Sequence, residues 1–182
     1  MKKMKNTKPP VTLINADGLI LGRMASKVAK RLLNGEELII VNAEKIVLSG
    51  KKKSKVAEAK EFLEVGAPER GPFHYRRPDR IVKKTVRGML PFKQPKGKNA
   101  YKKLKVFMGV PQDLKDQRMD TFTEAQATKL KGPHFTLAEL AKEIGWNQGE
   151  YLCQQKKSWL LAEKEKQPPP APSSNPASEE YA

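Results

Sequence analysis

The stretch from Val11 to Val41, VTLINADGLILGRMASKVAKRLLNGEELIIV, decides the fold. It begins with a short apolar, partly β-branched run, Val11–Asn15, which is typical of a buried strand. Asn34-Gly35 predicts the end of a helix, and Leu38–Val41 has the composition of a second strand. The opening is therefore β-α-β, which implies parallel strands and a right-handed crossover. Between the two strands, apolar residues recur at three- and four-residue spacing and predict one buried face of a helix. They are Leu21, Met24, Ala25, Val28, Ala29, Leu32 and Leu33.

The same kinds of pattern predict further elements downstream. Ile46–Leu48 is a third apolar run, and a basic loop over Lys51–Lys55 precedes a helix over Val56–Val65. Pro78 suits the first position of a helix that runs to about Met89, between irregular loops at 70–77 and 91–97. The remaining predictions are a short helix over Asn99–Leu104, a strand over Lys105–Val110, and a helix over Thr136–Ile144 that starts with a capping box of Thr136 and Glu139.

Positive charge is concentrated in one part of the chain. Residues 70–105 carry thirteen Lys or Arg against one acid, which is +12 of the net charge of +16. Solubilising surfaces normally mix both signs, so this asymmetry indicates a face for a polyanion, most commonly a phosphate backbone. Arg76, Arg77 and Arg87 suit bidentate phosphate contacts. Aromatic residues interleaved with the charges suit stacking on unpaired bases, as RNA recognition often requires.

Few residues are suited to metal, disulfide or membrane roles. The single cysteine, Cys153, excludes an internal disulfide and fits a reducing compartment. One cysteine and two histidines, His74 and His134, leave no zinc-ligand cluster. No run approaches the roughly 20 apolar residues of a membrane span, and the apolar core near the start is too short for a secretory signal. We therefore expect a cytoplasmic protein.

Two other functional classes stay open at this level. Asn15–Arg23 lies between a strand and a helix, where phosphate-binding loops occur, so a nucleotide-dependent enzyme is one alternative. The stretch lacks both G-x-G-x-x-G and G-x-x-x-x-G-K-[ST], and neither histidine has a nearby nucleophile pattern. We expect no catalytic residue, no cofactor and no metal. A free-standing RNA- or DNA-binding regulatory protein is the second alternative.

Several segments resemble the large-subunit ribosomal protein L13 family in its archaeal and eukaryotic form. They are LGRMASKVAKRLLNGE (21–36), VNAEKIVLSGKK (41–52), RGPFHYRRPDRIVKKTVRGMLP (70–91) and LKVFMGVP (104–111), with TLAELAKEIGW (136–146) further on. The third segment is the most specific. The resemblance runs from about Val11 to Trp146. The region around Tyr151 to Trp159 and the Pro-rich acidic tail after Gln167 depart from it.

The resemblance implies a three-layer α/β/α domain around a mostly parallel four-stranded sheet, with basic loops and a helical C-terminal extension. We divide the chain into a basic arm (1–10), a core (11–111) with an RNA-binding insertion (70–105), the helical extension (112–167) and a disordered tail (168–182). The implied function is a non-catalytic constituent of the large ribosomal subunit that binds large-subunit rRNA and supports assembly and translation. Its partners would be that rRNA and neighbouring ribosomal proteins, with no membrane and no small-molecule substrate.

The expected RNA contacts concentrate on the insertion, the Lys51–Lys55 loop and the N-terminal arm. The residues expected to make them are Lys51, Lys52, Lys53, Arg70, His74, Tyr75, Arg76, Arg77, Arg80, Lys83, Lys84, Arg87, Lys93, Lys96, Lys98, Lys102 and Lys103.

Overall fold

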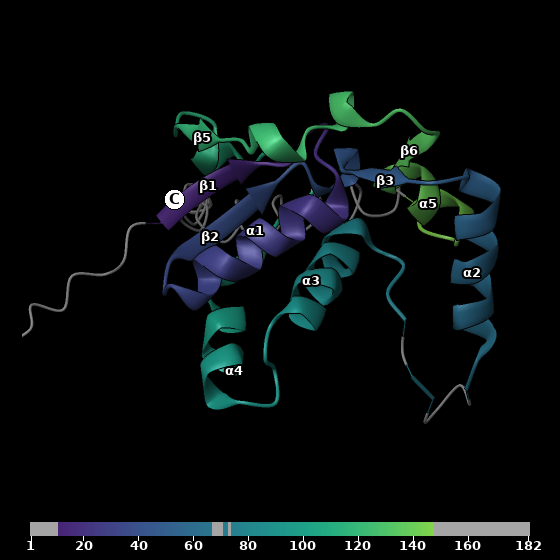
Figure 1. The fold of residues 1–182 in the computed structure, drawn as a ribbon, viewed down its shortest axis with the longest axis horizontal. Coiled ribbons are helices and arrows are strands. Elements are labelled where there is room, and N and C mark those ends of the chain that lie inside the picture. The colour runs from purple at the N-terminus through teal and green to yellow at the C-terminus, as the bar shows by residue number, and fades with distance from the viewer. Residues whose placement is uncertain (1–10, 67–70, 73, 148–182) are drawn as a thin grey trace, which may run out of the picture. The chain divides into compact units, whose positions relative to one another are not determined.

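The computed structural model describes residues 11–66, 71–72 and 74–147 (Figure 1). The described residues up to Trp146 belong to one compact unit. The predictions that fall on the N-terminal arm, on Arg70 and on residues 148–182 lie outside the described residues.

A four-stranded parallel sheet forms the centre of this unit. Its strands are β1 (Val11–Asn15), β2 (Glu37–Val41), β4 (Leu104–Val106) and β5 (Met119–Asp120). They lie in the order β4-β2-β1-β5, and each neighbouring pair is parallel. The expected α/β fold with a four-stranded parallel sheet is therefore confirmed.

Helix α1 (Leu21–Leu33) lies across the sheet next to β1 and β2 (Figure 1). Its predicted apolar face is buried, and side chains such as Met24 and Val28 pack with Ile14, Leu38 and Ile40 of the strands in one core. Burying a side chain of this size stabilises the fold by about 1.5–3 kcal/mol. This apolar contact holds α1 against the paired strands β1 and β2.

Two of the other helices, α2 (Lys52–Glu64) and α4 (Pro95–Lys102), begin earlier than the sequence predicts, whereas α3 (Pro78–Met89) has the predicted bounds. The expected loop at Lys51–Lys55 is thus mostly the first turn of α2. A cluster of lysines at a helix N-terminus is unfavourable for the helix dipole. Here Lys52 is neutralised by Glu139 and Glu143, whose carboxylates lie 3.8 and 3.2 Å from its Nζ.

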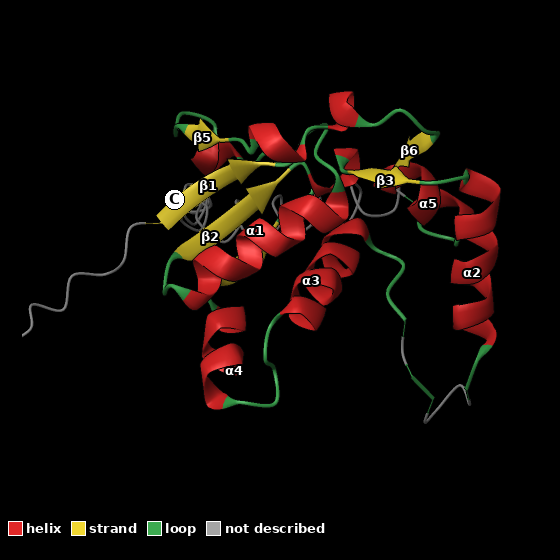
Figure 2. Ribbon diagram, viewed as in Figure 1, coloured by secondary structure: helices red, strands yellow, loops and turns green. Residues whose placement is uncertain are grey.

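The third apolar run and the segment after residue 111 take positions that the sequence does not predict. β3 (Val47–Ser49) pairs antiparallel with β6 (His134–Thr136) in a separate two-stranded sheet (Figure 2). The fourth strand of the main sheet is instead β5, from a segment assigned to the helical extension. The described part of that extension also contains short 3-10 turns at Gln112–Leu114, Thr123–Ala125 and Ala127–Lys129, and another lies at Ala43–Lys45.

Helix α5 (Leu137–Glu143) begins at the predicted capping residue. The Thr136 hydroxyl accepts a hydrogen bond from the Glu139 backbone N–H at 3.3 Å and donates to the Glu139 carboxylate at 3.0 Å. The helix ends at Glu143 and is closed by Gly145, where φ is +90°, while the Trp146 N–H donates to the Ala141 carbonyl at 2.9 Å. This left-handed closing geometry is one that glycine adopts without strain.

In the described ranges, no helix combines the length and the apolar character that crossing a membrane requires.

Candidate nucleic-acid interface

The basic side chains of α3 stand on a helix that is anchored in the core. Val82 and Val86 are fully buried, and the helix packs against α1. Arg80, Lys84 and Arg87 occupy the exposed side of the same helix, and Lys83 is half-buried. Because the buried stripe fixes the rotation of α3, these cations are held on one face. We call α3, α4 and the loop between them the α3–α4 surface.

The start of α3 is fixed by an ion pair between Arg77, which precedes the helix, and Asp79 in its first turn. The guanidinium of Arg77 donates to both carboxylate oxygens of Asp79, from Nε and from Nη2, each at 3.1 Å. Asp79, the acid of the 70–105 segment, therefore already has a cationic partner. It also lies in the first turn of α3, where a negative charge favours the helix dipole. Arg77 thus has a structural role in addition to the expected phosphate contact.

Aromatic rings support two of the arginines. The Arg87 guanidinium lies 4.1 Å from the centroid of the Phe92 ring, and Phe92 meets Tyr101 edge-to-face at 5.5 Å. The Arg80 guanidinium lies 5.7 Å from the Tyr75 ring centroid, and Tyr75 is 39% exposed. Each pair holds a cation over a ring. An arginine restrained in this way loses less side-chain entropy when its remaining N–H groups bind a phosphate.

His74 links α2 to α3. Its ring stacks on Phe62 of α2, with centroids 5.5 Å apart and an interplanar angle of 23°, and its Nδ1 lies 3.0 Å from the Lys84 ammonium. The sequence suggests that this imidazole stacks on a base or donates to a phosphate. In the structure one ring face and one nitrogen are engaged within the protein, so an RNA contact by His74 stays a prediction.

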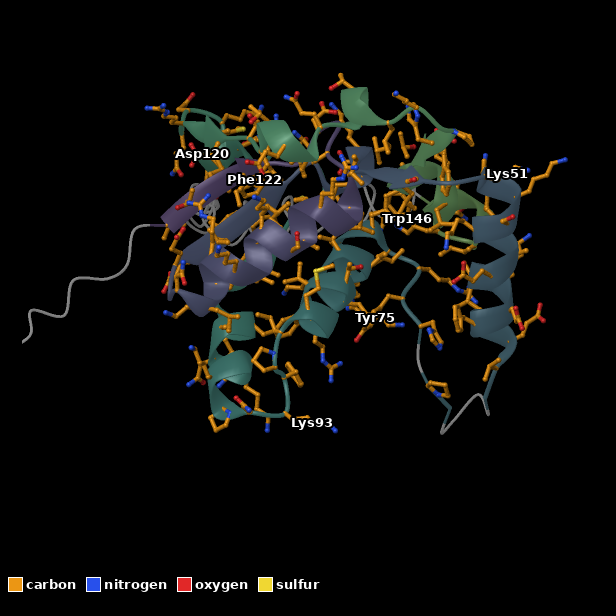
Figure 3. The ribbon with its side chains drawn as sticks, viewed as in Figure 1. Lys51, Tyr75, Lys93, Asp120, Phe122 and Trp146 are labelled. Carbon is orange, nitrogen blue, oxygen red and sulfur yellow. The ribbon has the colours of Figure 1, made fainter. Side chains whose placement is uncertain are left out.

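The predicted lysines divide into outward-facing and engaged side chains. Lys103 donates to the Gly35 carbonyl at 2.8 Å and joins α4 to the turn after α1, and Lys52 is paired with acids of α5. Figure 3 shows Lys51 at the N-terminal end of α2, well apart from Lys93 beside α4. The Lys51–Lys53 group therefore does not join the α3–α4 surface. The predicted side chains that are exposed are Lys51, Lys52, Lys53, Tyr75, Arg76, Arg80, Lys84, Arg87, Lys93, Lys96, Lys98 and Lys102, of which Lys52 is also paired with acids.

Tyr101 and Asp79 line a recess that the sequence analysis does not predict. The recess has a volume of about 210 Å³ and is lined by Tyr75, Asp79, Arg80, Lys83, Tyr101 and Val106. These residues come from the loop before α3, from α3 and α4, and from β4. Their convergence depends on the fold, and only the interleaving of aromatic and basic residues along the sequence hints at it.

Burial raises the pKa of the Tyr101 phenol above its ordinary value of 10.0, the neighbouring Tyr75 adds to the rise, and Arg87 opposes it. The folded state therefore keeps this proton to higher pH than the unfolded chain does. The contribution to stability is complete below the ordinary tyrosine pKa and is lost as the pH rises through the raised value. We expect Tyr101→Phe to remove a phenol that ionises above the ordinary tyrosine pKa in an ultraviolet-absorbance titration. Tyr75→Phe should instead lower the pKa of Tyr101, and an unchanged titration would contradict the proximity of the two rings.

The turn between β1 and α1 is closed by hydrogen bonds within the protein. The backbone N–H of Gly18 donates to the Lys45 carbonyl at 3.4 Å, that of Leu19 to Ala16 at 3.2 Å, and that of Ile20 to Ala125 at 2.8 Å. A phosphate-binding turn needs such N–H groups directed at its ligand. This turn uses them to connect parts of the core. The structure thus gives no support to the nucleotide-enzyme alternative at this position.

Comparison with known proteins shows the relatives of the chain. The family model described as Ribosomal protein L13 matches residues 10–113. The chain belongs to the ribosomal protein L13 family. A large ribosomal subunit protein uL13 from Archaeoglobus fulgidus is 46% identical over 137 residues, covering 74% of this chain and 88% of the relative. Proteins of the same name from Methanosarcina barkeri and Methanocaldococcus jannaschii are 47% and 46% identical, and the match covers 98% of each.

The L13 match contains the whole α3–α4 surface and three of the four strands of the main sheet. Each of the relatives named above is called a large ribosomal subunit protein. The relatives are archaeal, which confirms the archaeal-type resemblance. In the described part of the L13 fold, no group of three or more His, Cys, Asp or Glu is placed to hold a metal ion.

Proposed function

We propose that this L13-family chain binds large-subunit ribosomal RNA as a structural constituent of the large ribosomal subunit, and that it supports subunit assembly. The observation that carries the proposal is the α3–α4 surface. Its exposed cations lie on elements fixed by the core, and the acid among them, Asp79, is already bidentately paired with Arg77. Such a surface suits a dense, rigid polyanion.

The mechanism is scaffolding. RNA helices repel one another, and a protein surface with fixed cations lowers that repulsion where the helices approach. The α/β core provides the rigidity, because α3 is held by the buried Val82 and Val86. Each phosphate neutralised releases counterions, so affinity for naked rRNA should fall steeply with salt. Neighbouring ribosomal proteins are the proposed partners of the remaining surface.

The direct test is the sedimentation of the endogenous protein in a sucrose gradient of cell extract. We expect it to travel with large subunits and to remain with them through a second gradient. Extraction with concentrated salt should release it, because its contacts are largely electrostatic. A protein that stays at the top of the gradient in low salt would contradict the proposal and would favour the free-standing regulator.

A further inference from the structure

The recess beside α3 has the size and lining of a site for one small planar group. Its volume of about 210 Å³ lies below the roughly 300–1,000 Å³ of pockets for drug-sized ligands. Figure 3 shows Tyr75 next to α3, and Arg80 and Lys83 of that helix line the recess together with Tyr75. A single ring system with a phosphate attached would occupy such a space, whereas a duplex edge would not enter it.

The lining offers a stacking surface and positive charge together. Tyr75 is exposed over 39% of its surface, and Arg80 lies over its ring. Tyr101 and Val106 form the more apolar part of the wall. Base–aromatic stacking accepts every base, because each base has a π-face, and arginine adds a cation–π contribution. The cations of Arg80 and Lys83 are next to this surface, where the phosphate of a stacked nucleotide would lie.

Asp79 gives the recess a hydrogen-bond acceptor. An ionised carboxylate has about four lone-pair sites, and the two bonds from Arg77 engage one site on each oxygen. The same two bonds fix the orientation of the carboxylate. Its other lone pairs suit an amino group, such as those on the edges of cytosine, adenine and guanine. Uracil carries no exocyclic amino group, so this acceptor favours the other three bases.

We infer that the recess receives one unstacked nucleotide of the bound RNA, with its base against Tyr75, its amino edge at Asp79 and its phosphate at Arg80 and Lys83. The inference rests on the proposed RNA-binding function and adds to it a preference for an unpaired nucleotide. Extracting a base from a helix costs a few kcal/mol unless it is already unpaired. The site therefore selects bulges, loops and junctions over continuous duplex.

The test uses the full chain and five RNA hairpins of identical stem sequence. Four carry a single bulged nucleotide, either A, C, G or U, and the fifth is fully paired. Fluorescence anisotropy gives Kd for each hairpin. We expect the A, C or G bulges to bind about tenfold more tightly than the paired hairpin, the factor expected from one base–aromatic stack. The U bulge should fall between these values.

Two variants at Tyr75 separate stacking from charge. Tyr75→Leu removes the stacking ring, so the ratio of Kd between the paired and the bulged hairpins should fall toward one. Tyr75→Phe retains the ring and should keep the preference. Asp79→Asn keeps an oxygen acceptor and adds an amide donor, so it should shift the preference toward uracil. A loss of affinity that is equal for all five hairpins in Tyr75→Leu would overturn the inference.

The remaining outcomes distinguish the recess from the function. If all five hairpins bind equally well, the recess does not hold a nucleotide and the RNA-binding function stands. If none binds, the proposed function itself fails. The mononucleotides AMP, CMP, GMP and UMP are titrated in parallel. Saturation by any of them at the concentrations of the hairpins would assign the recess to a free nucleotide and overturn the RNA assignment.

Discussion

A variant that combines Arg80→Ala, Lys84→Ala, Arg87→Ala and Lys93→Ala should bind large-subunit rRNA on the order of a thousandfold more weakly than the natural chain at moderate salt. The four side chains are exposed, and all lie on the α3–α4 surface. Removing a cation that binds a phosphate should also lower the slope of log Kd against log salt, by about 1 for each such cation. Filter binding to an rRNA transcript over a series of salt concentrations measures both quantities.

The fold should survive these substitutions. Three of the four positions lie in α3, where alanine is the best helix former, and the buried stripe of Val82 and Val86 is untouched. Arg77 is left in place because it holds Asp79. Circular dichroism and the urea midpoint report whether the helix and the core are intact.

A matched control removes the same charge elsewhere. It replaces Lys27, Lys30, Lys45 and Lys115 with alanine, all of which are exposed and lie outside both the α3–α4 surface and the Lys51–Lys55 segment. We expect this control to lose only a little rRNA affinity, because its net charge is lower by the same four units. Equal losses in both variants would mean that affinity depends on total charge, and the assignment of this surface would be wrong.

Gly97→Ala should destabilise the protein by about 3 kcal/mol. A Cβ at Gly97 would lie 2.2 Å from the Pro91 carbonyl oxygen and 3.1 Å from the Phe92 nitrogen, both of which are backbone atoms. The Pro91 oxygen accepts a hydrogen bond from the Gln94 N–H at 3.0 Å, next to the start of α4. The added methyl must displace this turn. Urea unfolding measures the loss, and rRNA affinity should fall as well because Phe92 supports Arg87.

Gly22→Ala is the matched control, since it is also a substitution in a helix. A Cβ at Gly22 meets nothing within 4 Å. The alanine should therefore be neutral or should stabilise the protein by up to about 1 kcal/mol through helix propensity. If the two variants unfold at the same urea concentration, the approach of Gly97 to Pro91 does not constrain the loop.

The local elements of the fold were predictable because their signals are local. The apolar spacing of Leu21–Leu33 defines α1, Pro78 marks the start of α3, and Thr136 with Glu139 marks the start of α5. β5 gave no such signal, because two residues are too few for a periodic pattern. Its strand geometry comes from pairing with Leu13 and Ile14, which are distant in sequence. The early start of α2 likewise depends on acids supplied by α5.

The concentration of positive charge on the interface was predictable from the sequence. Which individual cations are exposed and which bind within the protein was not. Composition places the basic residues in one segment, but it treats Lys103 and Lys96 alike. In the structure Lys103 binds the Gly35 carbonyl, whereas Lys96 is exposed. The recess could not be predicted from the sequence either, because Tyr75, Asp79 and Tyr101 come together only when the chain between them has folded.

The order of strands in the main sheet has a consequence for the synthesis of the chain. β1 and β2 leave the ribosome early and pair with each other, but their outer edges are covered by β5 and β4, which come from Met119–Asp120 and Leu104–Val106. Until those residues emerge, the nascent sheet has two unpaired edges, and unpaired edges promote aggregation. The basic segment is translated within this interval. The sheet can therefore close only after the basic segment has been made, once Met119–Asp120 has left the ribosome, so the core and the surface for rRNA are completed almost together.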